Sequence, residues 1–177
     1  MKEYLHNGKD RGLGEAKEKQ VDDEFLRKIG LQGEENALYY LKKIKKDEYK
    51  IDSTPSRSIT NKEGGFIFTE DGKNIFEANW ENVHKEQYKG YDISYIDENE
   101  IKHYIEVKST VSSSKDWFYI TENEWKYFLK KGKRYFIYRV HNVEIGKKYN
   151  DDVYIIENPC KEWREGKIIA YPYKIEI

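Results

Sequence analysis

The spacing of hydrophobic residues changes from helical to strand-like along this chain. In the first quarter, apolar residues recur every three or four positions, which predicts a helix over residues 16–29 and a second helix over residues 33–45. Gly30 and Gly33 interrupt the pattern between the two. The apolar positions that define these helices are Val21, Phe25, Leu26, Ile29, Leu38, Leu41 and Ile44.

The second half of the chain has the alternation of strands, in which successive side chains point to opposite faces. Residues 101–110 place Ile105 and Val107 on one face, and Glu106 and Lys108 on the other. The other expected elements are a loop or hairpin over residues 52–75, a short strand at Val83, strands at 91–95, 117–118, 135–140 and 153–157, and a strand or extended tail at 168–177.

A further helix is expected after Thr121. In the pattern Thr121-x-x-Glu124, a capping box, the hydroxyl and the carboxylate each accept a hydrogen bond from an amide at the helix start. We expect this helix to pack through Trp125, Phe128 and Leu129 and to end near Gly132. Helices placed before and among linked strands are typical of a mixed α/β fold, with helices packed on a central sheet.

Composition favours a single domain in water. The chain has 177 residues, of which 37% are charged, and its mean hydropathy is -1.00. This length suits one core, so we expect a leader and helical extension over residues 1–28 and one domain over residues 29–177. No apolar run approaches the roughly 18–20 residues that cross a bilayer, and no secretory signal is recognisable. We therefore expect a cytoplasmic protein without membrane contact.

Cysteine content limits the chemistry further. Cys160 is the single cysteine, which excludes an internal disulfide and a multi-cysteine zinc site. We expect it to be a small packing residue.

Two acids and a lysine on neighbouring strands point to metal-dependent chemistry. Glu106 and Lys108 project from one side of their strand, roughly 6–7 Å apart along it, and the Asp92 carboxylate on the preceding strand can converge on the same point. Two carboxylates can hold a hard divalent cation, and an ammonium can face an attacking water or a phosphate oxygen. The pattern predicts phosphodiester cleavage. Because the net charge is -1, any nucleic-acid binding must come from a local patch or from the metal.

Each of these residues also has a purely structural interpretation. In a chain this rich in charge, Glu-x-Lys recurs by chance, so Asp92 could sit at a turn while Glu106 pairs with Lys108 across a solvated sheet face. Glu34 falls on the core side of the first turn of the 33–45 helix. An acid in that position either caps the helix or has a chemical role.

A series of short motifs runs through most of the chain. They are Gly33-Glu34, Trp80-x-Asn82, Glu86, Gly90-Tyr91-Asp92-Ile93, Ile105-Glu106-Val107-Lys108-Ser109-Thr110, Lys115-Asp116-Trp117-Phe118, Glu124-Trp125, Lys131-Gly132 and Asn158-Pro159. In this order they resemble the NO VEIN C-terminal domain family over roughly residues 29–170. That family is usually classed in the PD-(D/E)XK nuclease superfamily, whose fold is shared by many restriction enzymes and resolvases. Residues 1–28 and 52–75 depart from the family pattern.

The resemblance carries specific expectations. It implies a restriction-endonuclease-like α/β fold, in which a mixed central β-sheet is flanked by α-helices. It implies an active site of Asp92, Glu106 and Lys108, with Glu34 from the first helix. It also implies Mg²⁺, for which Mn²⁺ can substitute, held by Asp92, Glu106 and the main-chain carbonyl of Val107.

The residues after the lysine suggest where nucleic acid binds. Lys115 and Trp117 combine a cation for phosphate with a ring for base stacking. Of the adjacent Trp117 and Phe118, at least one is expected in the core. Ser109 and Thr110 either touch a phosphate or hydrogen-bond within their own loop.

Two functions fit these residues. The first is a Mg²⁺-dependent endonuclease acting on DNA in a restriction or phage-defence system. The second is an inactive nuclease-fold module that binds nucleic acid or a protein partner. Further expected partners are a second copy of this chain, docked through the 16–29 helix, or an ATPase or helicase subunit of a larger complex.

Overall fold

The computed structural model describes residues 23–85, 87 and 89–170 of the chain. Its strands are β1 (Arg57–Lys62), β2 (Gly65–Glu70), β3 (Lys73–Trp80), β4 (Ile93–Ile96), β5 (Lys102–Ser109), β6 (Tyr135–Val140) and β7 (Val153–Glu157). Its helices are α1 (Asp23–Glu48), α2 (Glu122–Lys131) and α3 (Pro159–Arg164), with 3-10 turns η1 (Ile51–Ser53) and η2 (Gly132–Arg134). The expected mixed α/β class is confirmed.

All seven strands belong to one sheet, and their spatial order is their order in the chain. Neighbouring strands are antiparallel except β5 and β6, which run parallel. A parallel pair needs a long crossover, and α2 lies in that connection. The order of strands therefore places the start of α2 beside the strand that carries Glu106 and Lys108.

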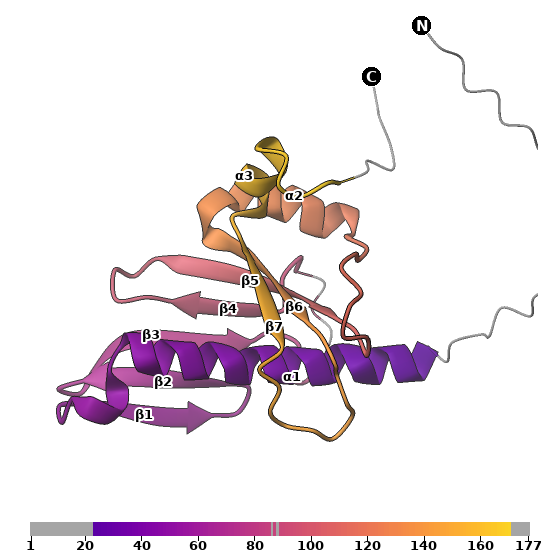
Figure 1. Cartoon of the computed structure of the whole chain (residues 1–177). Coiled ribbons are helices and arrows are strands. Elements are labelled where there is room, and N and C mark those ends of the chain that lie inside the picture. Colours follow the sequence, from indigo (N-terminus) through magenta and orange to yellow (C-terminus); the bar gives the residue numbers. More distant parts are fainter. Residues whose placement is uncertain (1–22, 86, 88, 171–177) are drawn as a thin grey trace, which may run out of the picture.

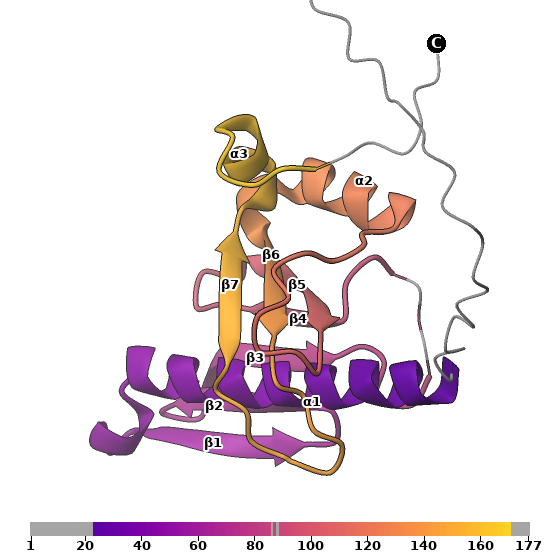
Figure 2. The same cartoon turned by 45° about the vertical axis from the view of Figure 1, so that its right-hand side comes forward.

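Helices cover both faces of the central strands. Ile105 and Val107 of β5 belong to a hydrophobic cluster with Leu41 of α1, whereas Tyr104 belongs to a second cluster with Phe128 of α2. Figures 1 and 2 show α1 lying along the sheet, with α2 and α3 gathered together away from it. Because side chains alternate along a strand, each face of β5 meets a different helix.

α1 is one continuous helix of 26 residues, so the predicted interruption at Gly30 and Gly33 is wrong. The surrounding Leu, Lys, Glu and Ala are strong helix formers, and a mid-helix glycine costs only about 1 kcal/mol relative to alanine. Gly33 serves a contact instead, since a Cβ there would lie 1.7 Å from Ser109 Oγ. Glycine at this position lets α1 approach the end of β5 closely.

The segment over residues 52–75 forms a hairpin that extends the sheet, one of the two predicted alternatives. Arg57 pairs with Glu70 and Lys62 with Gly65 in the β1–β2 register. Rings from these strands and from β3 pack together and are almost fully buried: Phe66, Phe68 and Phe76. Since large aromatic side chains contribute much of a core's buried area, this hairpin is part of the fold's stable centre.

Several other predictions are settled by the described residues. The strands at 135–140 and 153–157 and the capping box of α2 are confirmed, and Cys160 is a buried packing residue. Val83 lies in a bend, residues 117–118 form no strand, and Leu129 is exposed instead of packed, so these three predictions are wrong. α3 was not predicted, although Asn158 caps it and a proline occupies its first turn, which is a recognisable helix start.

Other predictions fall on residues that the structure does not describe. The expected leader over residues 1–15, Val21, Glu86 and the stretch 171–177 lie outside the described residues. Of the remaining apolar positions in the predicted first helix, Phe25 and Leu26 are exposed and Ile29 is buried.

Candidate functional site

The site lies where β4 begins and β5 continues past it, which we call the β4–β5 fork. The main-chain N–H of Asp92 donates to the carbonyl oxygen of Ile105 at 2.9 Å, and Asp92 Oδ2 accepts from the N–H of Val107 at 2.7 Å. The carboxylate therefore occupies the place where one more β4 residue would pair with β5. Burial and the nearby charge of Glu34 raise the pKa of Asp92 to about 8, against the opposing effect of the Val107 bond.

The turn that positions Asp92 at the start of β4 depends on the backbone conformation of Gly90. Its φ of +80° is a conformation that favours glycine, and a Cβ there would lie 2.9 Å from the ring of Tyr127. The buried hydroxyl of Tyr135 donates to the Gly90 carbonyl oxygen at 2.7 Å. Backbone geometry and this hydrogen bond together fix the entry to the fork.

Glu106 and Lys108 share one face of β5, as predicted, but that face is not solvated. Lys108 Nζ lies 2.8 Å from Glu106 Oε1 and 2.6 Å from Glu124 Oε2. Glu106 is only 5% exposed, and through Lys108 it is linked to Glu124 of α2. The interpretation of an ion pair on a solvated sheet is therefore wrong, and the lysine stands between two shielded carboxylates.

The charges in this cluster influence one another strongly. Burial, with the neighbouring charge of Asp92, raises the pKa of Glu106 well above its ordinary value. Burial alone would lower the pKa of Lys108, but the two carboxylates raise it overall. Burial opposes ionisation of Glu124 as well, yet Lys108 lowers its pKa. Lys108 is thus held as an ammonium.

Glu124 is a member of this cluster that the sequence analysis treated only as a helix cap. Its Oε2 accepts from the N–H of Thr121 at 2.9 Å, which is the capping-box bond, and also from Lys108. One carboxylate therefore starts α2 and orients the lysine. The sequence feature that could have identified Glu124 as a site residue is its place in the Glu124-Trp125 motif.

Glu34 reaches the fork from the opposite face of the sheet. It lies in the middle of α1, so the alternative of a helix cap is wrong. Its Oε2 accepts from Trp80 Nε1 at 2.6 Å and from Asn82 Nδ2 at 3.1 Å. Asn82 Nδ2 also donates to Asp92 Oδ1 at 2.9 Å, so the buried amide links the two acids. In the sequence, Trp80 and Asn82 belong to one of the family-like motifs, but the motif alone does not predict these hydrogen bonds.

The donor set suits a hard divalent cation. Asp92 and Glu106 are two shielded carboxylates close enough for the charge of one to raise the pKa of the other. The peptide groups of Ile105 and Val107 bond toward Asp92, which puts main-chain groups beside the pair. In the part of the chain that the structure describes, no three His, Cys, Asp or Glu side chains gather as a metal site. Mg²⁺ commonly uses one or two carboxylates with water and phosphate oxygens, so the residues fit it.

The predicted nucleic-acid residues divide into two groups. Ser109, Lys115 and Trp117 line a cavity of about 240 Å³ that opens beside Lys108. Thr110 Oγ1 accepts from the N–H of Ser112 at 3.1 Å, so this residue hydrogen-bonds within its own loop.

Phe118 and Arg139 explain how the cavity is built. Phe118 packs against the cluster beneath α2, as predicted for one of the two rings, while Trp117 is 53% exposed. Arg139 of β6 was not singled out from the sequence. It is buried and donates to the carbonyl oxygens of Lys115, Trp117 and Lys108. The sequence feature that could have identified Arg139 is a cationic residue in an otherwise apolar strand.

The structure also bears on membrane contact. Among the described residues, no helix combines the length and apolar character needed to span a bilayer.

Comparisons with known proteins place these residues in context. The family model described as "Protein NO VEIN, C-terminal" matches residues 59–156, which includes Asp92, Glu106, Lys108 and Glu124 but not Glu34. "Protein NO VEIN-LIKE" of Arabidopsis thaliana is 39% identical over 61 residues, which cover 34% of this chain and 9% of that protein. "Protein NO VEIN" of the same organism is 39% identical over 91 residues, covering 50% of this chain and 3% of that protein. The chain thus spans less than a tenth of these relatives. No solved structure matches.

Proposed function

Because the chain belongs to the NO VEIN C-terminal domain family, we propose that it is a Mg²⁺-dependent endonuclease of the PD-(D/E)XK type that hydrolyses phosphodiester bonds in DNA. The observation that carries the proposal is the grouping at the β4–β5 fork. There Asp92 is bonded to the Val107 amide, and Lys108 lies 2.8 Å from Glu106 on the same strand. In this proposal the fold is the restriction-endonuclease-like one.

The acids at the fork would hold the cation. Asp92 and Glu106, with the main-chain carbonyl of Val107, are the proposed ligands of Mg²⁺. When bound, the ion neutralises charge on the phosphate and lowers the pKa of its water. Asn82 positions the Asp92 carboxylate, and Glu34 in turn holds the Asn82 amide. Glu34 therefore acts on the site through Asn82.

Lys108 has a role that follows from its charge. Because the carboxylates raise its pKa, it carries a proton at neutral pH and cannot accept one. An ammonium in this place stabilises negative charge as it develops on the phosphate and orients the attacking water. Glu124 holds the ammonium from the helix side, so α2 aligns the group that faces the substrate.

Cleavage of supercoiled plasmid and labelled DNA oligonucleotides tests the proposal. With Mg²⁺ or Mn²⁺ the wild type should cut, and with EDTA it should not. Lys108→Ala and Asp92→Asn should each lower the rate on the order of 10²–10⁴-fold, because each removes a positioned charged group. Lys147→Ala is the matched control, since that lysine is exposed and pairs with Glu144 away from the site. A thermal melt of each variant separates lost chemistry from lost folding. Metal-dependent cutting that survives both substitutions would contradict the assignment.

A second candidate is an inactive module that binds nucleic acid or a protein partner. The engagement of Lys108 by two carboxylates favours it, because a lysine so paired has less charge to offer a phosphate. The change in melting temperature on adding Mg²⁺ distinguishes the endonuclease from the inactive binding module. A rise in melting temperature that Glu106→Gln removes supports the enzyme, whereas DNA binding without any metal effect supports the module.

A further inference from the structure

Beside the β4–β5 fork lies a surface that the proposed hydrolysis does not use. The cavity of about 240 Å³ is lined by Lys108 and Ser109 of β5, by the start of α1, and by Lys115, Trp117 and Tyr119. Because Lys108 lines it directly, whatever occupies this cavity lies next to the proposed reacting phosphate.

The wall that carries the rings is fixed to the sheet rather than loosely attached. Arg139 donates from its guanidinium to the carbonyl oxygens of Lys115 at 2.9 Å and Trp117 at 3.4 Å, and to that of Lys108 at 3.1 Å. One buried side chain thus ties residues 115–117 to the end of β5. Such a connection holds the rings at a set position relative to Lys108, and pre-organised contacts reduce the entropic cost of binding.

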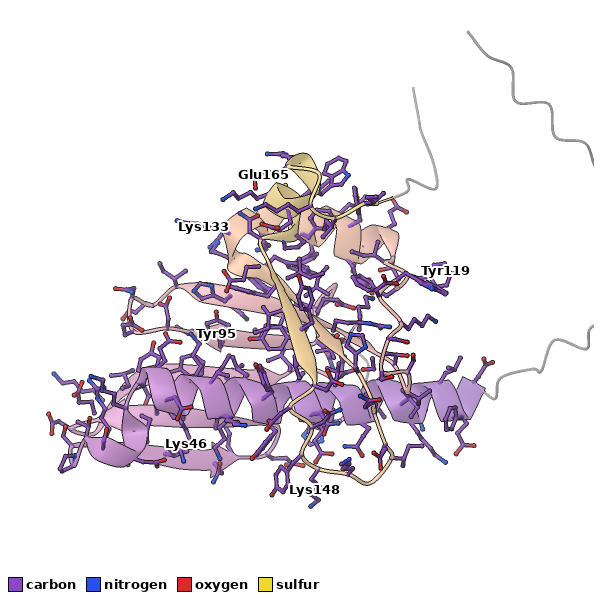
Figure 3. The ribbon with its side chains drawn as sticks, viewed as in Figure 1. Lys46, Tyr95, Tyr119, Lys133, Lys148 and Glu165 are labelled. Carbon is purple, nitrogen blue, oxygen red and sulfur yellow. The ribbon has the colours of Figure 1, made fainter. Side chains whose placement is uncertain are left out.

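The exposed rings have the properties of a base-stacking platform. Trp117 is 53% exposed and Tyr119 is 70% exposed, and their centroids lie 5.5 Å apart with nearly perpendicular planes. Figure 3 shows Tyr119 projecting outward from the fold. Lys115 Nζ lies over one face of the Trp117 ring, 3.8 Å from its centre, so the ammonium covers that face and a base would stack on the other. Aromatic rings next to a cation are the elements with which proteins hold unpaired nucleotides.

We propose that this surface binds a single-stranded segment of the nucleic-acid substrate, with one base stacked on Trp117 and a neighbouring phosphate paired with Lys115. The inference rests on the proposed nuclease function and adds the strandedness of its substrate. A paired base in a duplex has its faces covered by its neighbours and cannot stack on a protein ring without being extruded. A duplex is held mainly through its phosphates, whereas this chain has a net charge of -1.

Binding of fluorescein-labelled oligothymidine, compared with a duplex of equal length, tests the proposal. Anisotropy is measured on the whole chain in EDTA, where the proposed hydrolysis cannot proceed. Trp117→Ala should weaken single-strand binding roughly 5- to 150-fold, the range for loss of one base–aromatic stack. Trp117→Phe should retain most of the affinity because it keeps a stacking ring. Binding of the duplex should change less than about twofold.

Tyr119 and Tyr154 provide a matched control. Tyr154 lies on β7, does not line the cavity, and is 65% exposed, so the two tyrosines differ in place rather than in type or exposure. Tyr119→Ala should weaken oligothymidine binding and Tyr154→Ala should not. The proposal is overturned if Trp117→Ala and Tyr154→Ala bind alike while both melt as the wild type does, or if Trp117→Ala weakens duplex binding as much as single-strand binding. Oligothymidine that does not bind to the wild type overturns it too, and leaves the surface to a protein partner.

The cleavage assay keeps the two proposals apart. If Lys108→Ala abolishes cutting while Trp117→Ala leaves oligothymidine binding unchanged, only the single-strand surface is wrong. If Trp117-dependent binding is present but no metal produces cutting, the surface is supported and only the nuclease assignment is wrong.

Discussion

The two faces of β5 differ in composition although their residues alternate along one strand. Ile105 and Val107 pack against α1 within the larger hydrophobic cluster, whereas Glu106 and Lys108 face the start of α2. Burial of apolar surface stabilises a fold by roughly 25 cal/mol per Å². Burial of charges contributes little net stability even when they are paired. The comparison teaches that stability comes mainly from the α1 face, whereas the α2 face holds the buried ionisable groups.

The apolar face should show the largest effect on folding. Ile105→Ala removes a fully buried side chain between β5 and α1, and we expect it to lower the free energy of unfolding by about 2–5 kcal/mol. Urea denaturation followed by circular dichroism measures this. Leu129→Ala on the partly exposed side of α2 is the control and should lose much less. Equal losses at the two positions would show that burial on the α1 face is not what sets the stability.

The contact between α1 and the end of β5 should show the next largest effect. Gly33→Ala places a methyl group against Ser109, and overpacking of this kind costs about 1–3 kcal/mol. Gly30→Ala is the matched control in the same helix. A Cβ at Gly30 meets nothing within 4 Å, so the substitution should stabilise the helix by about 0.5–1 kcal/mol. If both substitutions shift the melting temperature in the same direction, the close approach of α1 is not real.

The charged face should show the smallest effect, with a characteristic dependence on pH. The pKa of Glu106 is raised on folding by burial and by Asp92, so the folded protein retains a proton that the unfolded chain releases. Its contribution to stability is therefore full below the ordinary carboxyl pKa of 4.5 and is lost as the pH rises through the raised value. Metal-free Glu106→Gln should therefore lose less stability than wild type as the pH rises from 4.5 through the raised pKa of Glu106.

Melting curves of the two proteins in EDTA across that range measure the difference. The control is Glu144→Gln, an exposed acid paired with Lys147, which should follow the wild type. Parallel curves for wild type and Glu106→Gln would mean that folding does not raise the pKa of Glu106.

Elements whose signal is local were predictable from the sequence. The strands at 135–140 and 153–157 have continuous apolar patterns, and the α2 start has a capping box complete within four residues. The helix interruption at Gly33 was mispredicted because its reason is a contact with Ser109, far away in the chain. Propensity alone treats such a glycine as a breaker.

The residues of the candidate site also divide into those that a local sequence pattern predicts and those that only the structure identifies. Glu106 and Lys108 were found because two residues on one strand face the same side by geometry. The pairing of Lys108 with Glu124 and the bridge from Asn82 to Glu34 depend on how α2 and α1 pack on the sheet. No local sequence pattern encodes those contacts, so only the structure could identify Glu124 and Asn82 as the partners of Lys108 and Glu34.

The strand order has a consequence for how the protein is made on the ribosome. Since every strand pairs with the one synthesised just before it, the sheet can grow in step with the emerging chain, without waiting for a distant partner. α1 is the exception, because Glu34 needs Asn82 and Gly33 needs Ser109, both of which emerge much later. Although α1 is synthesised before the sheet, it is thus among the last of the described elements to find its place, and the β4–β5 fork is completed only then.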